Sequence, residues 1–130
     1  ATVSLLKAYP NLSAIFCAWG EALDGALTAI SAAGSGVRLA GFGAEVNSFR
    51  AFDANNSNLI SVAGERASVI GRAAVNVLCK AVLKAPVPSA FVVPTVVVDG
   101  SNYRARWTEM YPNLRAPWEG NQATATPTAS

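Results

Sequence analysis

The residues best suited to contact a ligand stand in three short loops. Trp19 and Gly20, then Gly43, then Glu65 each come directly after a short apolar run of the sequence. The indole of Trp19 offers a flat apolar face and one N–H donor, and Glu65 offers a carboxylate. Such side chains bind small polar molecules, so we expect these loops to contribute to one ligand site.

Strand–loop–helix units position these loops. Three apolar runs are typical of buried parallel strands: 14–17, 37–42 and 59–63. The stretches that follow them have apolar residues at intervals of three and four, which predicts helices: 21–33, 45–54 and 66–83. Because ligands bind at the carboxyl ends of the strands in an open α/β sheet, the loops lie where a site is expected.

The remaining segments complete the expected fold. A helix precedes the first strand and ends near Pro10, short strands are predicted at 91–93 and 95–98, and another helix at 103–111. The longest helix has an apolar stripe that we expect to be buried: Ile70, Ala73, Ala74, Val77, Leu78 and Ala81. The sequence therefore predicts an α/β fold with three αβα layers and an open, mainly parallel sheet.

The sequence lacks the usual residues of catalysis and metal binding. It has no histidine and only two cysteines, Cys17 and Cys79. This removes the commonest general base, the commonest metal ligand and every Ser–His or Cys–His pair. Two distant cysteines form neither a zinc site nor a disulfide framework. We expect two buried free thiols, no metal and no cofactor, although carboxylate or lysine chemistry stays open.

Composition restricts the class of partner. The 130 residues are 52% hydrophobic and only 14% charged, which suits buried strands or a domain with one face covered by something else. The net charge of +2 comes from scattered Lys and Arg residues, so nucleic-acid binding is not expected. No apolar stretch approaches the roughly 20 residues of a membrane span.

Several stretches, taken in order, resemble one family. Residues 5–16 look like the turn "yPdl" followed by the strand "aIf", and residues 25–30 look like the helix "GAiqAl". Residues 37–43 look like the strand "i.vvGfD". Residues 71–74 look like the segment "mGr.Av", and residues 87–102 look like the ending "vp…vp…vtk.N". The series is similar to the carboxyl-terminal lobe of type I periplasmic solute-binding proteins, the sugar-binding components of bacterial ABC importers. The resemblance covers roughly residues 5–102.

The resemblance implies a two-lobed protein that closes over a solute, without catalysis. Closure excludes water and strengthens each polar contact. It implies a carbohydrate ligand, delivery to an ABC permease, and a location in the periplasm or on a lipid anchor outside the membrane. Residues 1–112 then form a partial lobe that lacks its first strand, and 113–130 a polar, flexible tail. We expect such a fragment to bind solute weakly and to form a homodimer through its exposed face, with exchanged elements.

The resemblance also suggests roles for individual residues. The family often has Asn-Asp where this chain has Trp19-Gly20, and Asp where it has Gly43. Both ligand carboxylates are therefore absent, which argues against a standard hexose or pentose. Glu65 stands where the family has a ligand-facing Gln, and Asn47 could replace a lost contact.

Each of these residues has a structural alternative. Trp19 could cover the end of the sheet, and Glu65 could cap the next helix, where its charge suits the helix dipole. Glu21 is best explained as an acidic residue of that kind in a first helical turn.

Two other functions remain open at this point. The segment Gly41-Phe42-Gly43, followed by Glu65 some twenty residues later, imitates a dinucleotide-binding fingerprint of an enzyme, but the third glycine is replaced by Val46. Repressors of the LacI type use the same lobes as an effector-binding core. Their DNA-binding helices would lie upstream of a sequence like this one.

Overall fold

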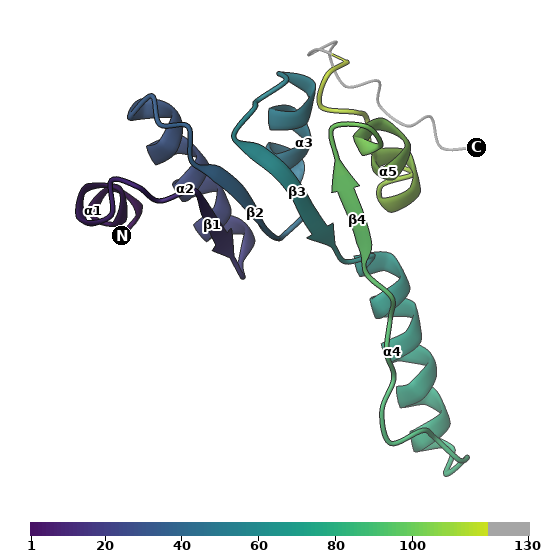
Figure 1. The fold of residues 1–130 in the computed structure, drawn as a ribbon. Helices are drawn as coiled ribbons and strands as arrows, with labels where there is room; N and C mark the ends of the chain where they lie inside the picture. Colours follow the sequence, from purple (N-terminus) through teal and green to yellow (C-terminus); the bar gives the residue numbers. More distant parts are fainter. Residues whose placement is uncertain (120–130) are drawn as a thin grey trace.

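The sheet has four strands in the order in which they occur along the chain (Figure 1). The strands are β1 (Ala14–Cys17), β2 (Arg38–Phe42), β3 (Leu59–Gly64) and β4 (Val96–Asp99). In this computed structural model, which describes residues 1–119, β1, β2 and β3 are parallel, and β4 runs antiparallel to β3. The carboxyl ends of the three parallel strands therefore meet at one edge, and the expected α/β class and mainly parallel sheet are confirmed.

Within residues 1–119, four of the five helices lie on one side of the sheet or pack against a helix on that side. The helices are α1 (Thr2–Ala8), α2 (Gly20–Ala32), α3 (Val46–Asp53), α4 (Ala67–Val82) and α5 (Tyr103–Met110). Helices α2, α3 and α5 cover one face of the sheet, and α1 packs against α2 (Figure 1).

The core lies between that face and the three helices. Leu23 and Ile30 of α2 pack over Leu39 of β2, and each of the three side chains is fully buried. Phe49 of α3 is fully buried as well and meets Trp107 of α5 edge to face, with ring centroids 5.1 Å apart. Burial of these apolar side chains is the main force that holds the loops at the carboxyl edge in place.

Helix α4 departs from the prediction. It projects beyond the carboxyl edge of the sheet (Figure 1), and none of its residues is buried. The prediction of a buried stripe from Ile70 to Ala81 was therefore wrong, and so was the prediction that Cys79 is buried, because the helix has no sheet beneath it. Cys17, in contrast, is buried as expected, and burial raises the pKa of its thiol.

Residues 91–95 run beside α4 and form no strand, so the short strand predicted at 91–93 was also wrong. Pro94 lacks the N–H that a ladder of hydrogen bonds requires. Pairing with β3 begins only at Val96, which lies opposite Gly64.

The face of the sheet opposite the core helices carries large exposed side chains. We call it the open face and define it by Phe16, Phe42, Ile60 and Val97, which are all exposed. The rings of Phe16 and Phe42 meet edge to face at 6.1 Å. Among the described residues, no helix is long and apolar enough to cross a membrane.

The segment after α5 folds back onto that helix. The ring of Trp118 packs edge to face against Tyr103 at 5.3 Å and against Trp107 at 6.0 Å. The guanidinium of Arg104 lies 5.3 Å from the centre of the Trp118 ring, within the range of a cation–π contact. The last part of the tail expected over 113–130, residues 120–130, lies outside the described residues.

Candidate ligand-binding site

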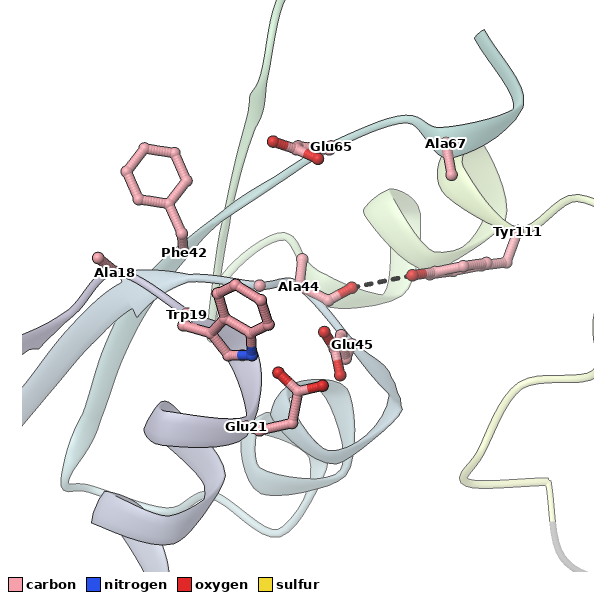
Figure 2. Close-up of a pocket in the computed structure, with 11 residues that line it drawn as sticks. Ala18, Trp19, Glu21, Phe42, Ala44, Glu45, Glu65, Ala67 and Tyr111 are labelled. Atoms are coloured by element: carbon pink, nitrogen blue, oxygen red, sulfur yellow. Dashed lines mark hydrogen bonds between the residues drawn. The ribbon is translucent and has the colours of Figure 1, made fainter. Parts of the chain in front are cut away.

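A cleft of about 450 Å³ lies at the carboxyl edge of the parallel strands (Figure 2). Its walls come from the loops after β1, β2 and β3 and from the end of α5. The larger side chains that line it are Trp19, Glu21, Phe42, Glu45, Glu65 and Tyr111. The cleft lies at the place where open α/β sheets bind their ligands.

Two glycines let the first two loops touch backbone to backbone. Gly43 has φ +106°, and a Cβ atom on it would come within 2.5 Å of the Cα atom of Gly20. A Cβ atom on Gly20 would in turn come within 2.4 Å of Oε1 of Glu45. Any larger residue at either position must therefore move a loop or the Glu45 carboxylate. Both predicted glycines line the cleft, and their backbones set its shape.

Three carboxylates line the cleft. Glu21 belongs to the first turn of α2, Glu45 is the residue before α3, and Glu65 follows β3. Figure 2 shows the carboxylates of Glu21 and Glu45 next to the indole of Trp19, with Glu65 further along the cleft wall. No Lys or Arg is among the residues that line the cleft. Within residues 1–119, no cluster of acidic, Cys or His side chains is arranged to hold a metal ion.

Sequence reasoning missed Glu45. The sequence predicts that the carboxylate contact is lost at Gly43, but Glu45 stands two residues later in the same loop and lines the cleft. Its side chain makes no capping hydrogen bond with α3. The available signal was its position in the loop after a strand, which sequence reasoning interpreted only as the start of a helix.

Tyr111 connects α5 to the loop after β2. Its hydroxyl donates a hydrogen bond to the carbonyl oxygen of Ala44 at 3.0 Å (Figure 2). Burial raises the pKa of the Tyr111 phenol, and the negative charge of Glu45 raises it further. The phenol therefore stays neutral and keeps the loop that carries Glu45 in place.

Trp19 and Asn47 lie in different surroundings. Trp19 precedes α2, and 65% of its surface is exposed at the mouth of the cleft. Asn47 does not line the cleft: its amide donates a hydrogen bond to the carboxylate of Asp24 at 2.6 Å and so links α3 to α2.

The glycine-rich segment after β2 has an explanation in packing. A Cβ atom on Gly41 would come within 2.2 Å of the carbonyl oxygen of Cys17 and 2.9 Å of Leu23. Gly41 thus lets β1 and α2 approach β2, which accounts for this glycine without a bound dinucleotide.

Comparison with known proteins supports a fold assignment. No family model matches the chain, and no curated protein matches it. Several solved structures do. A D-allose-bound periplasmic solute-binding protein of an ABC transporter from Actinobacillus succinogenes matches with 24% identity and a TM-score of 0.72. The match covers 80% of this chain and 36% of that one.

Two further structures agree with this match. An ABC sugar transporter subunit from Rhodobacter sphaeroides matches with 26% identity and a TM-score of 0.69, over 78% of this chain and 37% of that one. A 5-methylthioribose-bound solute-binding protein from Thermotoga lettingae matches with 18% identity and a TM-score of 0.75, over 85% of this chain and 38% of that one.

The chain therefore has the fold of one lobe of a periplasmic solute-binding protein of the ABC-transporter type. This confirms the resemblance seen in the sequence at the level of the fold. The chain spans less than two fifths of the length of each of these three structures.

Proposed function

We propose that this chain holds a sugar or sugar-like solute in the cleft at the carboxyl ends of β1, β2 and β3, as part of a binding protein for ABC-type import. The observation that carries the proposal is that all three loops line one cleft, with an exposed indole and three carboxylates. The similar proteins from A. succinogenes and T. lettingae, whose structures hold D-allose and 5-methylthioribose, support a sugar-like ligand.

The side chains suit a neutral, hydroxylated ring. The indole of Trp19 can stack on the apolar face of a sugar ring. The carboxylates of Glu21, Glu45 and Glu65 can accept hydrogen bonds from hydroxyl groups, and such charge-assisted bonds are stronger than neutral ones. Because no lining residue is cationic, an anionic solute such as a sugar phosphate is disfavoured by repulsion.

The proposal includes no catalytic step. The chain supplies one wall of the cleft, and a facing lobe would close over the solute and exclude water. Delivery to an ABC permease is part of the same proposal, as is a location in the periplasm or on a lipid anchor at the extracellular face of the membrane. We expect the chain alone to bind in the millimolar range, which corresponds to about −4 kcal/mol.

Measured affinities of variants test the proposal. We expect D-allose or 5-methylthioribose to bind the chain, and Glu45→Gln to weaken that binding about tenfold, the loss of roughly one charge-assisted hydrogen bond. Glu119→Gln is the matched control, because Glu119 is exposed, pairs with Arg115 and does not line the cleft. Ligand-observed NMR detects binding this weak. Equal affinities for the two variants would contradict the proposed site.

A further inference from the structure

The eight acidic side chains of the sequence fall into two groups. Five accept a hydrogen bond from another residue or form an ion pair with one: Asp24, Asp53, Asp99, Glu109 and Glu119. The carboxylates of Glu21, Glu45 and Glu65 form neither a hydrogen bond nor an ion pair with any residue of the described range 1–119. These three are also the acidic residues that line the cleft. The unpaired negative charge of the chain is therefore concentrated at the cleft.

No basic side chain compensates this charge. Neither Lys nor Arg is among the residues that line the cleft. Arg66 directly follows Glu65, but its guanidinium pairs with Glu109 of α5, with Nη1 3.3 Å from Oε1. Carboxylates that share a cleft with no cation repel one another, and a positive charge placed among them is attracted by all three. The electrostatics of the cleft therefore favour a ligand that carries a positive charge.

The aromatic side chains of the cleft have the same preference. The exposed indole of Trp19 lies next to the carboxylates of Glu21 and Glu45 (Figure 2). The ring of Phe42, which is 41% exposed, lines the cleft as well. The face of an aromatic ring attracts an ammonium group, and the attraction is strongest for Trp. The rings and the carboxylates therefore favour the same charge on the ligand.

The geometry fits an organic cation better than a metal ion. Within residues 1–119, no acidic, Cys or His side chains are grouped closely enough to hold a metal ion. Glu65 stands further along the cleft wall than Glu21 and Glu45 (Figure 2). A cleft of about 450 Å³ has room for a small ring molecule. Carboxylates spread along such a wall can contact different groups of one molecule of this size.

We propose that the solute carries a protonated amino group on its hydroxylated ring, as an amino sugar does. The inference rests on the proposed function, because it adds a charge to the solute of the same cleft. The ammonium group lies between the indole of Trp19 and the carboxylates of Glu21 and Glu45, and its three N–H groups donate charge-assisted hydrogen bonds to them. Glu65 accepts hydrogen bonds from hydroxyl groups of the ring.

Sugars that differ only in charge test the inference. The 2-amino and 3-amino derivatives of D-allose each replace one hydroxyl group by an amine, which is protonated at about pH 6. At low ionic strength, at least one of them should bind the chain about tenfold more tightly than D-allose. This preference should shrink at high salt, which screens the charges. The N-acetylated derivative is neutral and should lose the preference. Ligand-observed NMR measures these dissociation constants.

A substitution locates the amino group. Glu45→Gln removes one of the two charges beside Trp19 and should reduce the preference for the amino sugar over D-allose at least about threefold. Glu119→Gln is the control and should leave the preference unchanged, because Glu119 pairs with Arg115 outside the cleft. The preference is a ratio of two affinities of the same variant, so a partial loss of folded protein does not change it.

The outcomes separate this inference from the proposed function. D-allose that binds as tightly as both of its amino derivatives would overturn the amino group and leave the sugar site in place. A preference that is the same in Glu45→Gln and in the unsubstituted chain would overturn it as well. If none of these sugars bound the chain, the proposed function itself would be overturned, and the inference with it.

Discussion

The ionisation of Tyr111 depends on a charge in the cleft and affects the stability of the fold. Its phenol donates to the carbonyl of Ala44, and the next residue in the loop, Glu45, places a carboxylate in the same cleft. A raised phenol pKa in the folded chain stabilises the fold at pH values below the ordinary value of 10.0. This contribution is lost as the pH rises through the folded-state pKa.

We therefore expect the free energy of unfolding to fall above pH 10, in part through Tyr111. Tyr111→Phe should remove that part and should also cost about 1 kcal/mol at neutral pH for the lost hydrogen bond. Glu45→Gln should lower the pKa of Tyr111, while burial keeps it above the ordinary value. Titration of the phenolate absorbance measures the pKa of Tyr111. The same titration of Tyr111→Phe gives the signal of the other tyrosines, which is subtracted. An unchanged titration in Glu45→Gln would show that the two side chains do not interact.

Gly43 permits a second prediction at this scale. Gly43→Ala places a side chain at φ +106°, 2.5 Å from Gly20, and should lower the unfolding free energy by about 1–3 kcal/mol. Gly25→Ala is the matched control, because its added methyl group meets nothing within 4 Å and should stabilise α2 by about 0.5–1 kcal/mol. Chemical denaturation measures both values. Equal effects would mean that the two loops can separate at no cost.

Part of the site could be predicted from residues alone. Trp19, Gly20, Gly43 and Glu65 all line the cleft, because loops after parallel strands share one edge of the sheet. Glu45 was missed because an acidic residue before a helix has a structural explanation that sequence cannot separate from a ligand contact. The contact of Asn47 with Asp24 was not predictable either, because it depends on how α2 and α3 lie side by side.

At the scale of elements, the packing of α3 against α5 supports the loop that carries Glu45. Phe49 is fully buried and touches both Trp107 and Tyr111. Phe49→Ala should therefore lower the unfolding free energy by about 3–5 kcal/mol through lost burial and a residual cavity. Leu114→Ala, at a site 60% exposed, should change it by less than about 0.5 kcal/mol. Thermal or urea unfolding measures both free energies of unfolding. A small decrease in the unfolding free energy of Phe49→Ala would mean that α5 is not part of the cooperative core.

Helix periodicity predicted α4 but not its surroundings. An apolar stripe shows that a helix has a face to cover, yet it does not say which surface covers it. The same restriction applies to β4, whose sequence of three valines fits a strand in either direction. Its antiparallel pairing follows from the course of α4 and residues 83–95, which return the chain to the edge of β3 that it left at Gly64.

In the molecule as a whole, one face of the sheet is packed against helices, whereas the other face and α4 are exposed. The core helices bury one face of the sheet, while the open face and α4 are exposed in the single chain. A charged content of 14% is in keeping with the large share of apolar side chains on these exposed surfaces. The fold is that of one lobe of a solute-binding protein, and its cleft lies at the carboxyl edge of the parallel strands.

The proposed occupant of the cleft is a sugar-like solute. The most direct measurement is a titration of the ¹⁵N-labelled chain with D-allose and with 5-methylthioribose, followed by ¹H–¹⁵N correlation spectra. At least one solute should shift the Trp19 indole signal and the amides of the loops after β1, β2 and β3, leaving α1 and the far end of α4 unaffected. Shifts confined to other regions, or none with either solute at millimolar concentrations, would contradict the account.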